Sequence, residues 1–186
     1  AHTRYTAPDR LARHAGINPE DHPEELAIKG NQLGQEFDDL YSDLVSKETA
    51  AFFHGMMDLI RNIPDTVRVG ALTNAAGRYA HRVLKVNDET EWLYQRFGSI
   101  LGADNVPRPK PHGDGLLQVC SELRVDPGAC VYIGDSPSDG QAAQAAGMQA
   151  IGVSWGAHAE ESLTGNFGSI CETVDELKAL LPQHDR

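Results

Sequence analysis

The sequence predicts an α/β protein built around a parallel sheet. Short apolar runs rich in β-branched residues alternate with longer stretches in which apolar residues recur every three or four positions. Such alternation is typical of parallel strands joined by right-handed helical crossovers. Before this pattern begins, the chain is polar, charged and rich in helix formers. We therefore expect two domains, a helical one over residues 1–62 and an α/β one over residues 63–186.

The expected elements follow one another along the chain. Apolar residues of the first domain stand at the spacing of amphipathic helices, namely Leu33, Phe37, Leu40, Tyr41 and Leu44. In the second domain, short apolar runs predict strands over residues 67–72, 99–101, 129–133, 149–153 and 169–170. Helices are expected over residues 75–85, 89–96, 114–123, 139–146 and 173–181. The run 129–133 has the composition of a strand that is buried on both faces.

Charge and cysteine content narrow the classes of partner and compartment. The formal net charge is -11, with 27 acidic and 16 basic residues, which disfavours binding to nucleic acid. No apolar run approaches the roughly 18 residues of a membrane span, so no membrane partner is expected. Cys120, Cys130 and Cys171 show neither a CxxC nor a Cys/His ligand spacing. We expect no zinc site and no disulfide framework, and a reducing, cytoplasmic compartment fits best.

Polar residues follow two of the expected strands where each strand ends. Thr73 and Asn74 come after the first strand, and Asp135 and Asp139 come after the strand at 129–133. Lys110 lies between them in the sequence, in a loop broken by prolines. Because ligands of open parallel sheets bind beyond the carboxyl ends of the strands, these side chains are candidates for one site.

The residue types at this site suit phosphate and a divalent cation. Asp135 and Asp139 occupy the first and fifth positions of a turn that leads into a helix, so both carboxylates can face one point and hold Mg²⁺. Lys110 would bring a positive charge to phosphate oxygens, and Thr73 and Asn74 would donate hydrogen bonds to them. Taken alone, a GDxxxD turn is explained equally well by an aspartate that caps the helix.

Three sequence runs in order resemble the second, third and fourth motifs of the haloacid dehalogenase superfamily. They are ALTN at 71–74, RPKPHGDGLL at 108–117 and VYIGDSPSDGQAAQAAGM at 131–148. The run GVSWGAHAEESL at 152–163 is similar to the segment that follows the fourth motif in phosphoglycolate phosphatase-like members. The resemblance covers residues 67–181 and implies a Rossmann-like core, with the helical first third as a small cap domain.

The resemblance also implies an activity and a role for each site residue. It implies an Mg²⁺-dependent phosphomonoester hydrolase that acts on a small phosphorylated metabolite, similar to phosphoglycolate, through an aspartyl-phosphate. Thr73, with Asn74 beside it, would hydrogen-bond the transferring phosphoryl group, and Lys110 would neutralise the nucleophile and the phosphate. Asp135 and Asp139 would hold Mg²⁺ directly or through water.

The chain departs from the family pattern at the nucleophile. The family carries that aspartate in a DxDGT-like motif after an N-terminal strand, and the nearest lookalike, the run FDDL at 37–40, lacks the Gly and Thr and falls in a helical region. We expect the first strand and its motif to precede Ala1, and the chain without them to be inactive.

Other functions stay open at this stage. A noncatalytic phosphate- or metabolite-binding pseudoenzyme is favoured by the absent nucleophile, and a dehalogenase or phosphonatase would share the fold. A nucleotide-dependent oxidoreductase is disfavoured because no GxGxxG lies between a strand and a helix.

Overall fold

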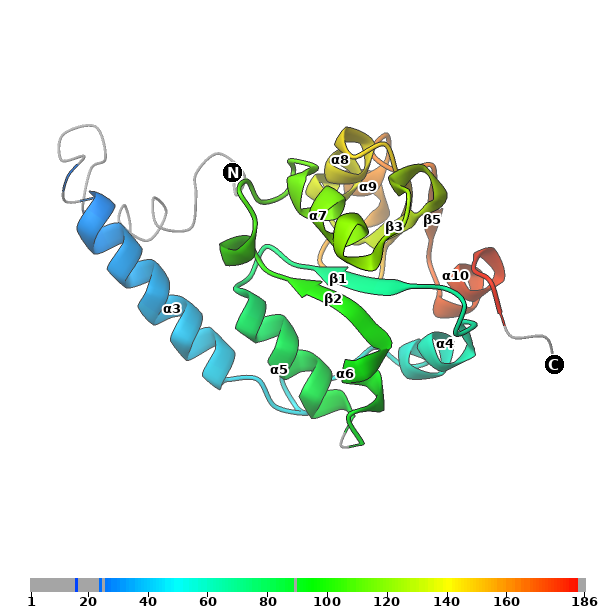
Figure 1. The fold of residues 1–186 in the computed structure, drawn as a ribbon, viewed down its shortest axis with the longest axis horizontal. Helices are drawn as coiled ribbons and strands as arrows, with labels where there is room; N and C mark the ends of the chain where they lie inside the picture. The colour runs from blue at the N-terminus through cyan, green and yellow to red at the C-terminus, as the bar shows by residue number, and fades with distance from the viewer. Residues whose placement is uncertain (1–15, 17–23, 25, 89, 184–186) are drawn as a thin grey trace. The chain divides into compact units, whose positions relative to one another are not determined.

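The chain divides into two compact units, residues 1–45 and residues 46–186. The computed structural model describes residues 16, 24, 26–88 and 90–183 (Figure 1). Much of the first expected domain, residues 1–15, 17–23 and 25, therefore lies outside the described residues.

The described part of the first unit is helical. A π-helical turn, η1 (Leu26–Gly30), leads into α3 (Asn31–Asp43). The rings of Phe37 and Tyr41 stack on one face of α3 with centroids 5.6 Å apart and an interplanar angle of 11°. Aromatic pairs four residues apart stabilise helices. The sequence predicted a helix in this region. The nucleophile lookalike at 37–40 lies inside α3, where it is part of a helix rather than of a strand end.

The described part of the second unit contains five strands, arranged in two parallel sheets. Strand β1 (Val69–Leu72) pairs with β2 (Phe97–Leu101). The other sheet has the order β3 (Val131–Gly134), β4 (Gln149–Val153), β5 (Ser169–Cys171). All of these pairs are parallel, which confirms the predicted α/β class. We expected one sheet; the difference arises because β1 and β3 share no ladder of backbone hydrogen bonds.

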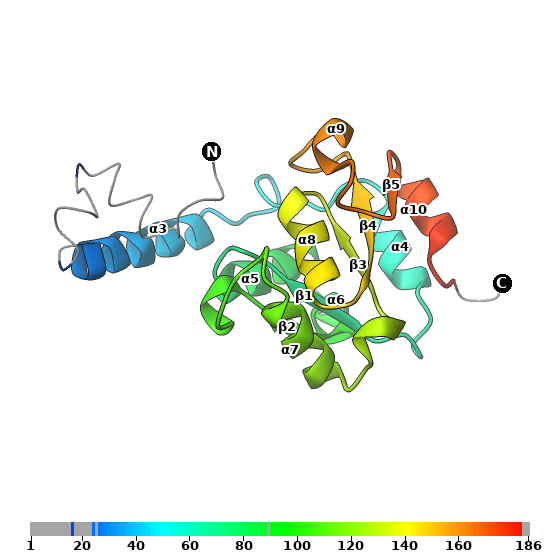
Figure 2. The same cartoon turned by 90° about the horizontal axis from the view of Figure 1, so that it is seen from above.

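Helices cover these strands as expected for crossover connections. Along the chain they are α4 (Met56–Asn62), α5 (Gly77–Asn87), α6 (Trp92–Arg96), α7 (Asp114–Leu123), α8 (Pro137–Ala145), α9 (Glu160–Leu163) and α10 (Val174–Leu180). Two single 3-10 turns, η2 (Ala103–Asn105) and η3 (Pro127–Ala129), precede α7 and β3. Helix α7 packs on β1 and β2, and α8 packs on β3 and β4 (Figure 2).

Helix α4 belongs to the core of the second unit. Its residues Leu59 and Ile60 are only 2% and 6% exposed, and they share a hydrophobic cluster with Leu177 of α10. Burial of a leucine or isoleucine stabilises a fold by about 1.5–3 kcal/mol, so α4 is anchored to this unit. Residues 46–62, which we assigned to the first domain, therefore lie in the second unit, whose boundary falls at Ser46. Assignment of the earlier residues to a cap remains a prediction.

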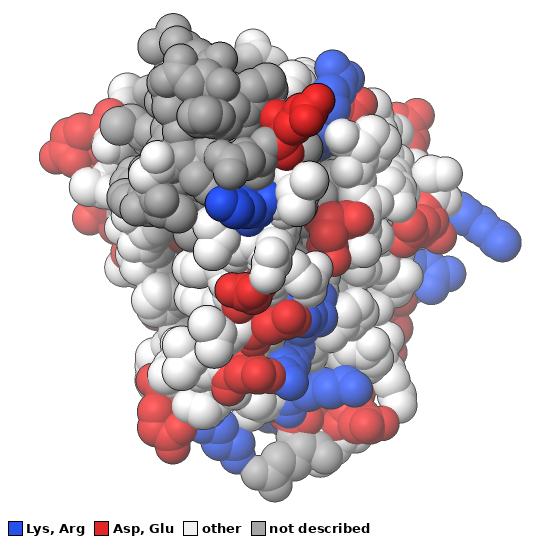
Figure 3. All heavy atoms as spheres, turned by 90° about the vertical axis from the view of Figure 1, so that its left-hand side faces the viewer, with Lys and Arg blue, Asp and Glu red and all other residues white. Residues whose placement is uncertain are grey.

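The described surface carries charges of both signs and several exposed large apolar side chains. Acidic and basic side chains are interspersed on the face drawn in Figure 3. Within the ranges that the structure describes, every helix is too short or too polar to cross a membrane.

Candidate functional site

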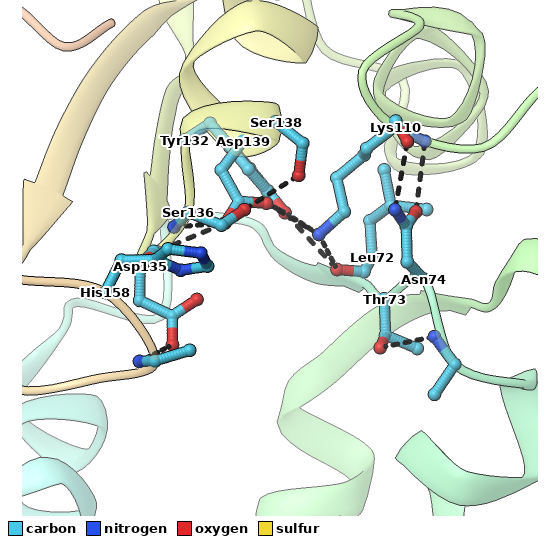
Figure 4. Close-up of polar contacts among 12 residues, drawn as sticks. Leu72, Thr73, Asn74, Lys110, Tyr132, Asp135, Ser136, Ser138, Asp139 and His158 are labelled. Atoms are coloured by element: carbon cyan, nitrogen blue, oxygen red, sulfur yellow. Dashed lines mark hydrogen bonds and ion pairs between the residues drawn. The ribbon is translucent and has the colours of Figure 1, made fainter. Parts of the chain in front are cut away.

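Four sequence-predicted residues come from the carboxyl ends of β1 and β3. Thr73 and Asn74 directly follow β1, Asp135 follows β3, and Asp139 lies in the first turn of α8. Lys110 reaches them from the loop between η2 and α7. Figure 4 shows the Lys110 amine between the two strand ends, with the Asp139 carboxylate on one side and Leu72 on the other. The structure therefore brings Lys110 and Asp139 into direct contact.

The ammonium of Lys110 is held by three acceptors. Its Nζ lies 2.6 Å from Oδ1 of Asp139, 3.0 Å from the Tyr132 hydroxyl and 3.4 Å from the carbonyl oxygen of Leu72. The side chains of Lys110 and Asp139 are only 10% and 5% exposed. Since an ammonium has three protons, these contacts use its whole donor capacity. A buried cation is thereby fixed where β1 and β3 end.

The second oxygen of Asp139 closes the turn that begins α8. Oδ2 accepts hydrogen bonds from the backbone N–H of Asp135 at 3.1 Å and from that of Ser136 at 3.0 Å. The Ser136 hydroxyl donates to the same oxygen at 2.9 Å. Ser136 is the N-cap of α8, and it forms a reciprocal capping box with Asp139. The helix-capping explanation of the GDxxxD turn thus applies to the second aspartate, not to the first.

Protonation of this cluster follows from burial and from the ion pair. Burial favours a neutral Lys110, yet Tyr132, Asp139 and the hydrogen bonds that the lysine donates to both outweigh burial and raise the pKa of the lysine above 10.5. Burial also favours a neutral Asp139, but the Lys110 ammonium and the Ser136 hydrogen bonds hold its pKa below 3.8. Burial raises the pKa of Tyr132 to about 12. At neutral pH the pair is therefore charged, and the phenol keeps its proton.

Asp135 points toward a different neighbour. Its Oδ2 accepts a hydrogen bond of 2.8 Å from the backbone N–H of Ala157, and its backbone carbonyl lies 3.1 Å from Nδ1 of His158. A Cβ at Gly156 would overlap the Asp135 carboxylate, so the close approach of this loop requires glycine there. Figure 4 shows the Asp135 side chain directed toward the loop of His158, while Asp139 faces Lys110.

Residues of the loop after β4 were not among the sequence-predicted site residues. Ala157 and His158 lie in the run 152–163, which the sequence singled out only as a resemblance. Strand β4 is the parallel neighbour of β3, so its carboxyl end lies at the same edge of the sheet. The rule that ligands bind beyond strand ends could have identified these residues.

Thr73 and Asn74 make contacts with the chain itself. The Thr73 hydroxyl accepts a hydrogen bond of 3.0 Å from the backbone N–H of Ala75. The Asn74 side chain donates to the carbonyl of Lys110 at 2.9 Å and accepts from the N–H of Lys110 at 3.0 Å. Asn74 therefore positions the Lys110 backbone, whereas the Thr73 hydroxyl keeps its proton available for another acceptor.

Of the two aspartates, Asp135 is better suited to bind a cation. Both oxygens of Asp139 accept hydrogen bonds, whereas the structure records no contact between Oδ1 of Asp135 and any other described residue. Among the described residues, no group of three or more His, Cys, Asp or Glu side chains could enclose a metal ion. Such sparse protein ligation is compatible with Mg²⁺, which keeps several waters and is often bound through one or two carboxylates.

Comparisons with known proteins find similar sequences over most of the chain. A family model described as haloacid dehalogenase-like hydrolase matches residues 2–153. The chain is 31% identical to a phosphoglycolate phosphatase of Pseudomonas putida over 177 residues, which are 93% of this chain and 60% of that protein. It is 31% identical to a phosphoglycolate phosphatase of Nitrosococcus oceani over 179 residues, which are 94% of this chain and 76% of that protein. The chain thus spans about 60% of the length of the first of these relatives.

A solved structure shares the fold at lower sequence identity. The crystal structure of β-phosphoglucomutase from Clostridium difficile aligns with a TM-score of 0.67 at 19% identity. The alignment covers 91% of this chain and 70% of the other. This similarity confirms the predicted architecture.

Proposed function

Since the chain belongs to the haloacid dehalogenase-like hydrolases, we propose that it serves, in the cytoplasm, in the Mg²⁺-dependent hydrolysis of a small phosphorylated metabolite. The observation that carries the proposal is the buried Lys110 ammonium, held 2.6 Å from Asp139 at the ends of β1 and β3. A fixed cation at strand ends stabilises the negative charge of a transferring phosphoryl group, because it needs no reorganisation during the reaction.

The remaining residues have complementary roles in this proposal. The Thr73 hydroxyl donates to a phosphate oxygen, and Asn74 keeps the Lys110 loop in place through its paired hydrogen bonds. Asp135 binds the metal through its carboxylate, and Asp139 acts on the site through Lys110. Bound Mg²⁺ would supply a second positive charge to the phosphate. The open Oδ1 of Asp135 and the saturated carboxylate of Asp139 support this division of roles.

The nucleophile requires a residue beyond this cluster. An aspartyl-phosphate route needs a carboxylate that attacks phosphorus, and Asp139 is committed to Lys110 and to the α8 cap. No DxDGT-like motif occurs in residues 1–186. In this proposal the attacking aspartate therefore lies outside the cluster of Lys110, Asp135 and Asp139.

Phosphoglycolate is the first substrate to test. The two relatives described above carry the name phosphoglycolate phosphatase, which supports a small carboxylated phosphomonoester. We would measure phosphate release from phosphoglycolate and from p-nitrophenyl phosphate, with Mg²⁺ and with EDTA, using natural protein of known intact mass. We expect Mg²⁺-dependent turnover that Lys110→Met abolishes and that Lys85→Met, a change at an exposed position of α5, leaves intact. Folded natural protein that releases no phosphate from either substrate would overturn the proposal.

One observation favours a second function. No DxDGT-like motif occurs in residues 1–186, and a noncatalytic phosphate-binding protein would need none. Isothermal titration with inorganic phosphate separates the two functions. If the natural protein shows no turnover but binds phosphate, and Lys110→Met abolishes that binding, the protein is a phosphate-binding module.

A further inference from the structure

Cys120 and Cys130 lie side by side in the structure, although they are 10 positions apart and follow no metal-ligand spacing in the sequence. Cys120 is in the last turn of α7, and Cys130 directly precedes β3. Their sulfur atoms are 3.9 Å apart, with the Cys120 thiol donating to Cys130. The Cys130 thiol in turn donates to the carbonyl oxygen of Asp126 at 3.2 Å. The third cysteine, Cys171, lies in β5.

The loop between the two thiols is held in place by its own hydrogen bonds. Helix α7 ends at Arg124 in a left-handed conformation with φ of 57°, and the N–H of Val125 then donates to the carbonyl of Cys120 at 3.0 Å. The Asp126 side chain accepts a hydrogen bond of 2.8 Å from Gly128 at the start of η3. These contacts turn the chain back on itself. The short distance between the sulfurs is therefore a property of an ordered turn.

The two thiols differ in access to solvent. Cys120 is 2% exposed, and burial, with smaller effects from Cys130 and Asp126, raises its pKa to about 11. Cys130 is partly exposed, so a dissolved oxidant reaches its sulfur first. Such an arrangement of one accessible and one adjacent sheltered thiol is typical of an attacking and a resolving cysteine.

We propose that Cys120 and Cys130 form a dithiol that a hydroperoxide oxidises to an intramolecular disulfide. The Cys130 thiolate attacks the peroxide, the O–O bond breaks, and the departing oxygen takes a proton to leave as water or an alcohol. The resulting sulfenic acid is attacked by the sulfur of Cys120. The S–O bond breaks, and the hydroxide leaves as water with the proton of Cys120. Two electrons pass from the sulfurs to the peroxide.

A disulfide between Cys120 and Cys130 would link α7 to the start of β3, which is the end of the strand far from Lys110 and Asp139. Cys130 precedes Val131, where β3 begins, while Asp135 follows Gly134, where β3 ends. Oxidation therefore leaves the Lys110–Asp139 pair untouched and instead closes the short loop between α7 and β3. A closed loop of about 10 residues should raise the thermal midpoint by roughly 5–10 °C in a domain of this size. The inference is independent of the proposed phosphatase function.

The sequence permits a direct test by peptide mapping. Trypsin cleaves after Arg124, between the two cysteines, and prolines protect the bonds after Arg108 and Lys110. Cys120 is then in peptide 97–124, and Cys130 and Cys171 are in peptide 125–178. The chain would be treated with hydrogen peroxide, blocked with iodoacetamide and digested without reductant. We expect the two peptides to be linked, with the loss of two hydrogen atoms, and to separate on addition of dithiothreitol.

Two variants make the result specific. Cys171→Ser should keep the link, and Cys130→Ser, a change at a partly exposed position, should abolish both the link and the rise in thermal midpoint. Peptides that stay separate while Cys130 gains oxygen, a link that survives in Cys130→Ser, or links only between two copies of the chain would each overturn the proposal. Because the peptide map does not depend on turnover and turnover does not depend on the disulfide, either idea can fail without the other.

Discussion

The ends of β1 and β3 hold the same lysine in different ways. After β1, the neutral side-chain amide of Asn74 makes two hydrogen bonds with the Lys110 backbone at an exposed position. After β3, the carboxylate of Asp139 forms a buried ion pair with the Lys110 ammonium. The first contact fixes the loop, and the second fixes the charge. Hydrogen bonds between neutral exposed groups contribute little, whereas a buried ion is costly once its partner is removed.

The largest effect should therefore come from Asp139. We expect Asp139→Asn to reduce the free energy of unfolding by about 3–5 kcal/mol, because the Lys110 ammonium stays buried without a counter-charge. Urea denaturation followed by circular dichroism measures this change. Asp65→Asn, at an exposed turn position, is the matched control and should cost little.

A double-mutant cycle identifies the ion pair as the cause. If the cost comes from an unpaired ammonium, adding Lys110→Met to Asp139→Asn should restore part of the lost stability. If the loss in the double variant instead equals the sum of the two single losses, the capping of α8 by Asp139 carries the effect.

Acid pH should weaken the ion pair of Asp139 with Lys110 before it weakens the hydrogen bonds of Asn74 with the Lys110 backbone. Despite desolvation, the pairing with Lys110 keeps the pKa of Asp139 below 3.8, so its carboxylate binds a proton more readily in the unfolded chain. The resulting stability is fully present above pH 3.8 and is lost as the pH falls through the lower, folded-state pKa. Unfolding free energies measured from pH 6 downward should fall more steeply in the native chain than in Asp139→Asn. Parallel curves would contradict the assignment.

Sequence reasoning identified the residue types of this site but not their partners. Strand-end logic correctly placed Thr73 and Asn74 after β1 and Asp135 after β3, although the two strands belong to separate sheets. It could not show that Asp139 pairs with a lysine 29 positions earlier in the chain. Spacing along a turn gives the direction of a carboxylate only approximately, and long-range packing decides which group it meets.

The same limit explains the reassigned helix and the thiol pair. The apolar spacing of α4 predicts a buried face but does not say which core buries it, and Leu59 packs with Leu177 across a long sequence separation. Cys120 and Cys130 lack a recognised motif, and the turn that starts at Arg124 brings them together. Local patterns predict elements, whereas the pairing of elements depends on the whole fold.

A smaller effect is expected at the β1 end. Asn74→Ala removes both hydrogen bonds to the Lys110 backbone, yet water can replace them at this exposed position, so the loss should be about 1 kcal/mol. We expect phosphate binding to weaken more than stability does, since the loop that carries Lys110 becomes less well positioned. Isothermal titration with phosphate measures the loss of binding in Asn74→Ala, and urea denaturation of the same variant measures its loss of stability.

The smallest effect should come from an ion pair next to Lys110. Arg108 contacts Asp114 with two hydrogen bonds, of 2.6 and 3.0 Å, at the start of α7, but its side chain is 62% exposed. Exposed pairs gain little because water screens them and because ordering the long side chain costs entropy. We expect Arg108→Ala to leave the thermal midpoint and phosphate binding within measurement error, also at low salt. If phosphate binding instead weakened as in Asn74→Ala, the Lys110 loop would have three anchors rather than two, and the contrast between the strand ends would explain only part of its position.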